Sequence, residues 1–296
     1  MLIAISADVV EIQFRKPSMN YKAGQWLFLN CPDVSYFQWH PFTITSSPSD
    51  PYISVHIRQV GDFTRNFADA VGAGPSQDKL FDQLDPNGVY EIALRHGETM
   101  PSLRIDGPYG APAEDVFRNE ISILIGAGIG VTPWASVLKN IWHTRRNPDK
   151  QGRLRRVEFI WVCRDTTSFE WFQTLLSSLE AQDEDNSFLG IHIYLTQRID
   201  GDMAANIMLN TVGAGKDAVT ELKTRTNFGR PDFKRFFGEV RDGIMDGSYL
   251  PGLEASFKKS VGVYFCGPSV AGKGIKAACR DISGREVQFK FWKEQF

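Results

Sequence analysis

The chain has 296 residues, 42% of them apolar and 23% charged, and its 33 basic and 35 acidic residues give a formal net charge of -2. This ordinary soluble composition excludes wholesale disorder, a collagen-like fibre and a membrane protein with many spans. The length fits two domains better than one small core. Because no overall positive charge would attract nucleic acid, we predict no nucleic-acid partner, and any phosphate group would have to bind at a local site.

The cysteines predict neither a disulfide framework nor a metal site. All four are scattered, and no two form a CxxC pair: Cys31, Cys163, Cys266 and Cys279. A reducing compartment therefore fits best. The first eight residues lack the cationic region of a signal peptide.

One stretch, residues 121–138, has no formal charge over a length at the lower edge of a membrane span. Three glycines and Pro133 divide its apolar content into two runs. A buried strand, a loop and a helix explain this division better than one spanning helix, so we predict no transmembrane segment.

The first third of the chain predicts short strands separated by turn residues. Six runs rich in β-branched or aromatic residues are bounded by Gly, Pro, Asn or Asp: Val9–Phe14, Gln25–Cys31, Phe42–Thr45, Tyr52–Val60, Val89–His96 and Ser102–Ile105. Such closely spaced strands suggest a small antiparallel barrel. Within residues 52–60, apolar and polar residues alternate, so a half-buried strand would direct His56 and Arg58 to one solvent or ligand face.

From about Asp115 the pattern changes to strands that alternate with helices. The strand candidates are Ile121–Ile125, Val157–Cys163, His192–Thr196 and Gly262–Cys266. This alternation predicts a parallel sheet with helices on both faces. The first of those helices should begin with Thr132 as N-cap and Pro133 at the first helical position. Residues 72–88 and 198–215 are expected to be surface loops, and residues 239–259 a further insertion.

Residues Gly126 to Pro133, with the sequence GAGIGVTP, lie between a predicted strand and a predicted helix. Glycines allow backbone N–H groups to approach an anion, and a helix N-terminus favours a pyrophosphate. The motif departs from GxGxxG, and a close strand-to-helix crossing would explain it without any ligand. The strand-loop-helix context favours a dinucleotide loop.

The next strand ends at Cys163-Arg164-Asp165, where an acidic residue would select NAD and an arginine NADP. Both residue types are present. Residues 222–235 contain five cations and one acid in an otherwise neutral chain: Lys223, Arg225, Arg230, Lys234 and Arg235 against Asp232. This local charge favours a 2′-phosphate and therefore NADPH, although at least two of the five cations fit a solvated helix face equally well.

Residues His40 to Ser46 place a candidate cation, a ring and hydroxyl groups in the order that would contact a flavin's phosphates, ring face and ring nitrogens. Composition alone would also allow a plain strand and turn. Arg58, and a tight turn over residues 106–110, would supply further anion and backbone contacts.

Eight short motifs follow one another across essentially the whole chain: HPFTITS, HIR with GDFT, DGPYG, GAGIGVTP, CRDTTSFEW, NFGRPDF, CGP and FKFWKEQF. In this order they resemble the cytosolic dehydrogenase portion of NADPH oxidases, and among these the fungal type. The broader ferredoxin-NADP reductase-like superfamily shares only the flavin motif, the glycine loop and CGP.

The resemblance implies α/β plus all-β architecture: an N-terminal antiparallel Greek-key FAD-binding barrel over residues 1–114, then a Rossmann-like parallel-sheet NADPH-binding domain over residues 115–296. The implied cofactors are FAD and NADPH, with no metal. The implied FAD contacts are His40, Pro41, Phe42, Thr43, Ile44, Thr45, Ser46, His56, Ile57, Arg58, Thr64, Gly107 and Pro108. Thr43 is expected near flavin N5, and Arg58 is expected to face the pyrophosphate.

For the nucleotide, the resemblance implies the pyrophosphate loop Gly126, Gly128, Ile129, Gly130, Thr132 and Pro133. It also implies Arg164 and Arg230 at the 2′-phosphate and Thr196 near the adenosine end. Cys266, Gly267 and Pro268 would flank the nicotinamide, and Phe296 would cover the flavin ring. Thr43, Cys266 and Phe296 are thus the expected catalytic residues, and removing Phe296 should change nicotinamide access.

The implied reaction is hydride transfer from nicotinamide C4 to flavin N5, which depends on positioning more than on acid-base chemistry. In the parent oxidase single electrons would then pass to haem and to oxygen, giving superoxide. Only five histidines occur in the chain, none in the paired spacing of stacked haems, so haem is expected only in a membrane domain that this sequence lacks. The sequence also begins within what resembles the first flavin-domain strand, as a fragment would.

The implied location is the cytosolic face of a membrane, as part of an integral membrane oxidase. Implied partners are the haem-bearing transmembrane domain, a Rac-type small GTPase and a cytosolic activator subunit. Two other interpretations stay open: the dehydrogenase portion of a ferric-chelate reductase, and a non-catalytic nucleotide-binding docking module. The docking module should have lost the flavin or glycine motif, yet both are intact.

Overall fold

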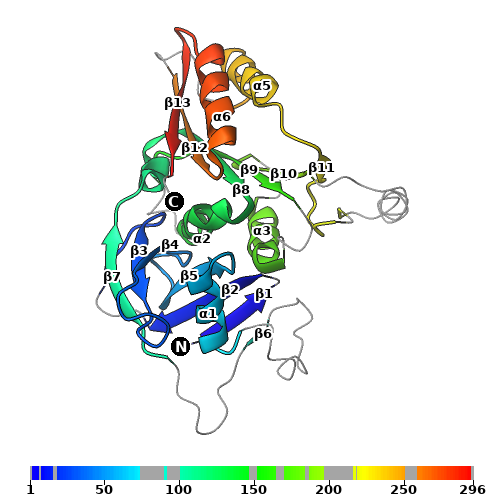
Figure 1. Cartoon of the computed structure of the whole chain (residues 1–296). Coiled ribbons are helices and arrows are strands. Elements are labelled where there is room, and N and C mark those ends of the chain that lie inside the picture. Colours follow the sequence, from blue (N-terminus) through cyan, green and yellow to red (C-terminus); the bar gives the residue numbers. More distant parts are fainter. Residues whose placement is uncertain are drawn as a thin grey trace. The chain divides into compact units, whose positions relative to one another are not determined.

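The computed structural model describes residues 2–6, 8–15, 19–73, 90–91, 101–146, 152–164, 170–183, 187–196, 216–217, 219–250 and 259–294 (Figure 1). The chain divides into two compact units. One comprises Met1–Glu114 with Thr132–His143, and the other Asp115–Val131 with Thr144–Phe296. Residues Thr132–His143, which come after the start of the second unit in the sequence, thus group with the first unit.

The first unit is built on two antiparallel sheets. One has the strand order β5-β2-β1-β6 and the other β4-β3-β7. The strands are β1 (Leu2–Ser6), β2 (Val9–Arg15), β3 (Trp26–Asn30), β4 (His40–Thr43), β5 (Tyr52–Arg58), β6 (Tyr90–Glu91) and β7 (Arg104–Tyr109). A single bridge between Ile44 and Val55 connects the chain after β4 to β5. The antiparallel character that the strand pattern predicted is confirmed.

Apolar side chains from both sheets and from α1 (Asp62–Ala70) form the core of this unit. Ile53, Val55 and Ile57 of β5 are fully or almost fully buried in it, as their alternation predicts. Phe63 and Phe67 of α1 pack into the same core because they are four residues apart on one helix face.

The second unit is an all-parallel six-stranded sheet with the order β11-β10-β9-β8-β12-β13. The strands are β8 (Ile121–Ala127), β9 (Arg156–Cys163), β10 (Leu189–Leu195), β11 (Asn227–Phe228), β12 (Lys259–Cys266) and β13 (Val287–Lys293). The helices are α2 (Thr132–Arg145), whose first twelve residues group with the first unit, α3 (Glu170–Gln182), α5 (Phe233–Met245) and α6 (Ser269–Ile282). Short 3₁₀ helices, η1 (Pro112–Arg118) and η2 (Gly128–Val131), flank β8.

Helices cover both faces of this sheet, as the alternation of strands and helices predicts. Ile160 of β9 belongs to a core cluster that includes residues of α5 and α6. Trp161, the next residue and therefore on the opposite face, packs edge-on against Phe172 of α3, with ring centroids 5.4 Å apart.

Several local predictions were wrong or incomplete. The residue that caps α2 is Val131, not Thr132, because η2 runs directly into the helix. The helix therefore begins one residue earlier than predicted, at Thr132. Residues 239–245, expected in an insertion, belong to α5. The expected strand over residues 89–96 is described only at Tyr90–Glu91, as β6. The expected loops over residues 74–88 and 198–215, and residues 251–258 of the insertion, lie outside the described residues.

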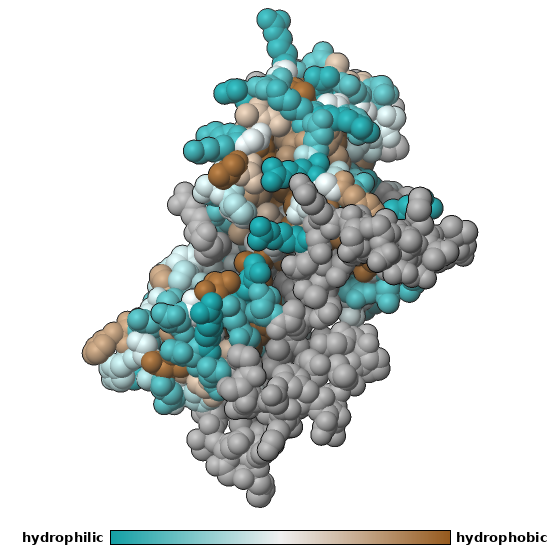
Figure 2. Space-filling view, turned by 45° about the vertical axis from the view of Figure 1, so that its right-hand side comes forward, coloured by the Kyte–Doolittle hydropathy of each residue, from teal (hydrophilic) through white to brown (hydrophobic). Residues whose placement is uncertain are grey.

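No helix in the described part of the chain is long and apolar enough to cross a membrane. On the face drawn in Figure 2, hydrophilic residues cover much of the coloured surface, and hydrophobic residues gather in small groups. The segment 121–138 forms β8, η2 and the start of α2, which confirms its division into strand, loop and helix.

Candidate functional site

The predicted nucleotide residues lie at the carboxyl edge of the parallel sheet. In the strand register Gly126 pairs with Cys266, Ala127 with Val162, and Leu195 with Cys163 and Phe228. The segments that follow these strands therefore leave the sheet at the same edge. Ligands of open α/β sheets bind at that edge, where the strand order reverses, and here the reversal lies between β8 and β12.

The glycine loop packs directly against the segment after β12. A Cβ atom on Gly130 would overlap the carbonyl oxygen of Cys266 and would lie 3.1 Å from the nitrogen of Gly267. Gly128 has a positive φ of 56° with open space around its Cα, and its carbonyl oxygen accepts a hydrogen bond of 3.2 Å from Trp161 Nε1. Glycine at these positions lets the loop stay close to the sheet while keeping backbone accessible to an anion.

The Cys266 side chain is buried at this junction. Burial raises the pKa of its thiol to about 12, with the charge of Glu294 acting in the same direction. The thiol is therefore protonated at neutral pH and offers a neutral, polarizable surface instead of a nucleophile. The backbone N–H of Glu294 donates to the carbonyl oxygen of Phe265, at 2.9 Å, so the chain after β13 lies beside Cys266. Phe296 itself lies outside the described residues.

The candidate 2′-phosphate residues follow neighbouring strands at the same edge. Thr196 binds the carbonyl oxygen of Cys163 through its backbone N–H at 2.8 Å and its hydroxyl at 2.9 Å. Arg164 comes directly after Cys163 and is exposed. Arg230 is also exposed and comes two residues after Phe228, the end of β11. The register thus brings all three predicted residues to adjacent strand ends.

Two of the five clustered cations are used on a helix surface. Lys234 forms an ion pair of 2.6 Å with Asp281, and Arg235 one of 2.8 Å with Glu239, both with exposed cations. Lys234 and Arg235 thus fit the alternative in which at least two of the five cations belong to a solvent-exposed helix face. Lys223, Arg225 and Arg230 precede α5 and are exposed.

In the first unit His40 is a neutral ring, not the cation that the motif suggested. Its ring stacks on Phe63 with centroids 3.8 Å apart and an angle of 21°. Burial lowers its pKa. The Nε2 atom is buried and has no hydrogen-bond partner among the described residues. An unsatisfied polar atom of this kind fits a ligand group that would complete it.

The residues after His40 divide into two sets. Pro41 is exposed, Phe42 is half-buried and Thr43 is buried at the end of β4. Ile44, Thr45 and Ser46 have fully buried side chains. The Thr45 hydroxyl lies 2.8 Å from both Ser54 Oγ and His56 Nδ1, and Ser46 Oγ lies 2.8 Å from the Tyr21 hydroxyl. The side chains of these last three residues are therefore engaged inside the unit.

His56 and Arg58 share one face of β5, as expected, but only Arg58 is exposed on that face. His56 is only 7% exposed, and burial lowers its pKa to about 4, although Glu11, 3.9 Å away, acts in the opposite direction. Arg58 is exposed and pairs with Asp8 at 2.6 Å. Ile57, between them, is in the core. This face of β5 is buried at Ser54 and His56 and exposed at Arg58, so alternation in the sequence did not mark a solvent face along the whole strand.

Arg58 is followed closely by the start of α1. The Thr64 hydroxyl accepts hydrogen bonds from the N–H groups of Gly61, at 3.0 Å, and Val60, at 3.1 Å, which fixes the helix start. Gly107 and Pro108 lie within β7, not in the tight turn that was expected. The pairing of β7 with β3 shifts register between Trp26 and Phe28, and Gly107 has a φ of 146° there. Arg58 can attract phosphate, and the segment after it exposes backbone at a helix start.

Two family models match the chain. Residues 1–113 match an FAD-binding domain and residues 120–280 the ferric reductase NAD-binding domain. Among curated relatives, mouse NADPH oxidase 1 is 38% identical over 98% of this chain and 44% of that protein. A superoxide-generating NADPH oxidase heavy chain from Dictyostelium discoideum is 38% identical over 97% of this chain and 52% of that protein. The chain thus spans about half the length of these relatives.

Solved structures resemble the fold at low identity. A ferredoxin NADP+ reductase from Neisseria gonorrhoeae with bound FAD and NADP is 12% identical, with a TM-score of 0.52 over 98% of both chains. The CS-b5R domains of human Ncb5or, in the NAD+ form, are 18% identical with a TM-score of 0.54 over 98% of this chain and 68% of that chain. The residues described above fit both cofactors: no described residue satisfies the Nε2 atom of His40, and Gly130 keeps the nucleotide loop closed against Cys266. The chain therefore belongs to the ferric reductase NAD-binding domain family, joins that domain to an FAD-binding domain, and is a homologue of the NADPH oxidases.

Proposed function

We propose that this chain is the dehydrogenase part of a superoxide-generating oxidase and passes hydride from NADPH to FAD. The observation that carries the proposal is the contact of the glycine loop with Cys266 and Gly267 at the carboxyl edge of the sheet. That contact brings the two predicted nucleotide motifs, which lie about half the chain apart in the sequence, to one place. Residues 1–114 would bind FAD and residues 115–296 NADPH.

The protein's own contribution would be binding and positioning. Backbone N–H groups of the loop from Gly126 to Gly130 would hold the pyrophosphate, and Arg164 and Arg230 the 2′-phosphate. The neutral thiol of Cys266 would lie against the nicotinamide without adding a charge. When bound, FAD would supply the conversion between a two-electron hydride and single electrons.

The flavin contacts follow the same logic. Thr43, at the end of β4, would approach the flavin near N5, and Arg58 would face the diphosphate. Neutral His40 would complete its free Nε2 with a cofactor group. Phe296 would cover the flavin ring and move aside for nicotinamide. This set contains no carboxylate and no thiolate, which suits a reaction that requires alignment more than proton transfer.

The rest of the oxidase reaction belongs to the longer protein. Single electrons would pass to haem in a transmembrane domain and then to oxygen, with this chain on the cytosolic face of the membrane. The proposed regulators are a Rac-type small GTPase and a cytosolic activator subunit. The relatives' length, about twice that of this chain, leaves room for such a domain.

A second candidate is the dehydrogenase part of a ferric-chelate reductase. The description of the family matched by residues 120–280 favours it. The two candidates share the hydride step and differ only in the final acceptor. Superoxide and ferric-chelate reduction measured side by side in the full-length protein would separate them.

An anaerobic titration tests the shared step. Purified protein is supplied with FAD and then with NADPH or NADH, and flavin bleaching is followed by absorbance. We expect FAD to bind and to bleach rapidly with NADPH and more slowly with NADH. A protein that does not bind FAD, or binds it and is not bleached by either nucleotide, contradicts the proposal.

A further inference from the structure

Helix α2 carries a polar stripe where a buried helix ordinarily carries an apolar one. Ser136, Lys139, Asn140 and His143 have the spacing of one helix face. Residues Thr132–His143 of this helix group with the first unit. The hydrogen bonds of Ser136 and His143 go to polar groups of that unit, at Ser46 and Asp50.

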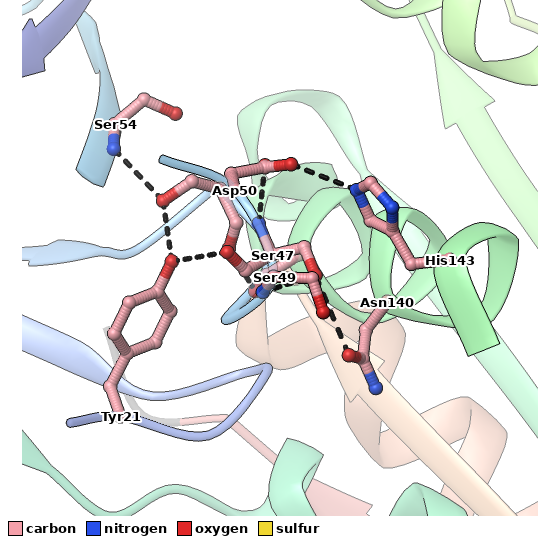
Figure 3. A network of polar contacts seen from close by, with 9 residues as sticks. Tyr21, Ser47, Ser49, Asp50, Ser54, Asn140 and His143 are labelled. Carbon is pink, nitrogen blue, oxygen red and sulfur yellow. Dashed lines mark hydrogen bonds and ion pairs between the residues drawn. The ribbon is translucent and has the colours of Figure 1, made fainter. Parts of the chain in front are cut away.

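Two well-formed contacts join the stripe to the chain just after the flavin motif. The Ser136 hydroxyl, fully buried, donates to the carbonyl oxygen of Ser46 at 2.6 Å. His143 Nε2 lies 2.9 Å from Asp50 Oδ1, so this ring nitrogen carries the hydrogen that the carboxylate accepts. Figure 3 shows His143 and Asn140 of α2 pointing toward the segment that holds Ser47, Ser49 and Asp50.

The receiving segment, Ser46–Asp50, is itself held in place. The backbone N–H of Ser47 donates to Asp50 Oδ2 at 2.8 Å, and the N–H of Asp50 donates to the carbonyl oxygen of Ser47 at 2.9 Å. Tyr21 donates its hydroxyl to that same carbonyl oxygen at 2.6 Å. Burial raises the pKa of Tyr21 to about 12, so it remains a donor at any physiological pH. The turn is thus a rigid acceptor for α2.

Lys139 adds a long-range contact to the same surface. Burial has the largest effect on the pKa of Glu11 and of His56, raising the first and lowering the second, and the charge of Lys139 lowers both. The charge of Lys139 therefore acts on half-buried Glu11 of β2 and on buried His56 of β5.

These contacts join a turn next to the flavin segment to a helix next to the glycine loop. The Ser46–Asp50 turn directly follows Thr43 and its neighbours in the flavin segment, and α2 directly follows the glycine loop that ends at Val131. We propose that Ser136 and His143 are positioning residues that anchor the helix of the nucleotide loop to the flavin segment and so set the alignment for hydride transfer. This inference rests on the proposed function. Small errors of alignment cost a large part of the rate of such transfers.

The test uses the FAD-loaded chain with four variants and one control. Ser136→Ala and His143→Phe each remove one donor, the double variant removes both, and His143→Gln keeps a donor for Asp50. The control is Lys276→Ala, an exposed residue of α6. Three quantities are measured: the limiting rate of anaerobic flavin reduction by NADPH, the Kd of NADP+ by calorimetry, and hydrogen exchange of the amides of residues 132–143 without nucleotide.

We expect the double variant to lower the limiting rate about 10-fold while the Kd of NADP+ changes less than about 2-fold. Amide exchange in residues 132–143 should speed up, whereas exchange in β8 and β12 should stay as in the wild type. His143→Gln should recover most of the rate lost in His143→Phe. If the double variant does not fold, the limiting rate of flavin reduction and the Kd of NADP+ are compared in the same way for the single variants.

Two failures are distinguishable. If the wild type is not bleached by NADPH, the proposed function is wrong. If the wild type is bleached and the Ser136 and His143 variants reduce flavin at the wild-type rate, with unchanged exchange in α2, the positioning role is wrong. An equal loss of rate and of NADP+ affinity would also overturn it, because that result indicates a damaged nucleotide site.

Discussion

Gly130 and Cys266 lie backbone against backbone: a Cβ atom on Gly130 would overlap the Cys266 carbonyl oxygen. The contact joins the end of the glycine loop to the end of β12, whose last residue pairs with Gly126. The loop cannot move away from the sheet without opening a gap there, and it cannot take a larger residue.

Gly130→Ala should therefore weaken NADPH binding without affecting FAD. Overpacking costs about 1–3 kcal/mol, which corresponds to roughly a 5- to 150-fold higher Kd if the displacement falls on the loop. Calorimetry with NADP+ and fluorescence titration with FAD measure the two affinities. Gly238→Ala, on α5, is the matched control, because a Cβ atom added there would have no described residue within 4 Å. Normal NADP+ binding by Gly130→Ala would show that the loop does not hold the nucleotide.

The exposed arginines at adjacent strand ends should decide between the two nicotinamide cofactors. Arg164→Ala and Arg230→Ala should each lower kcat/KM for NADPH by roughly 10-fold or more, since a hydrogen bond to a charged group contributes about 1.5–3 kcal/mol. Activity with NADH should change little. Arg235→Ala serves as the control, because Arg235 is paired with Glu239 on the surface of α5. A parallel loss with both cofactors would argue against a 2′-phosphate site.

The protonated state of Cys266 should make the hydride step insensitive to pH in the neutral range. Its pKa, raised to about 12 mainly by burial, lies far above the ordinary value for a thiol. The rate of anaerobic flavin reduction should therefore show no inflection near pH 8.5 from this residue, and Cys266→Ser should give a profile of the same shape. An inflection in the wild type that disappears in Cys266→Ser would mean that the thiolate takes part.

Local patterns in the sequence predicted most strands because their side chains repeat with period two or form buried runs. The same patterns missed β13, since its residues were interpreted only as an aromatic ending, although Val287, Phe289 and Phe291 alternate. They predicted the glycine loop, whereas the role of the CGP segment came only from the family resemblance. Only the parallel pairing of β8 with β12 shows that these two motifs meet.

The burial of His56 could not be predicted from β5 alone. Its alternation with apolar neighbours is the pattern of a half-exposed strand, and the residue that influences it electrostatically from α2, Lys139, lies more than eighty positions later. The pairing of Asp50 with His143 could not be predicted either, because the two residues lie far apart in the sequence. A polar side chain such as His143 on a helix indicates an exposed face unless another element supplies its partner.

Buried His56 should make the first unit lose stability as the pH falls from about 6.5 to about 4. Its pKa is lowered to about 4 in the folded chain, chiefly by burial, against an ordinary value of 6.5. Between these values the unfolded chain binds a proton that the folded chain does not, so folding becomes less favourable as the pH falls, by up to about 3 kcal/mol. Above pH 6.5 the contribution is complete. Urea unfolding of the wild type at several pH values from 4 to 7.5 measures this slope.

His56→Asn should flatten that slope. An amide oxygen or nitrogen near the position of Nδ1 keeps a polar partner for the Thr45 hydroxyl, which lies 2.8 Å from the histidine nitrogen, yet it does not titrate. The variant is expected to be less stable than the wild type at pH 7.5, because it packs less volume, and to approach the wild type near pH 4.5. Below that value the neighbouring Glu11, whose pKa is lowered, begins to protonate and both proteins should lose stability together. Equal slopes for the two proteins between pH 6.5 and 4.5 would mean that His56 takes up its proton in the folded state at an ordinary pH, and that the polar side of β5 is open to solvent after all.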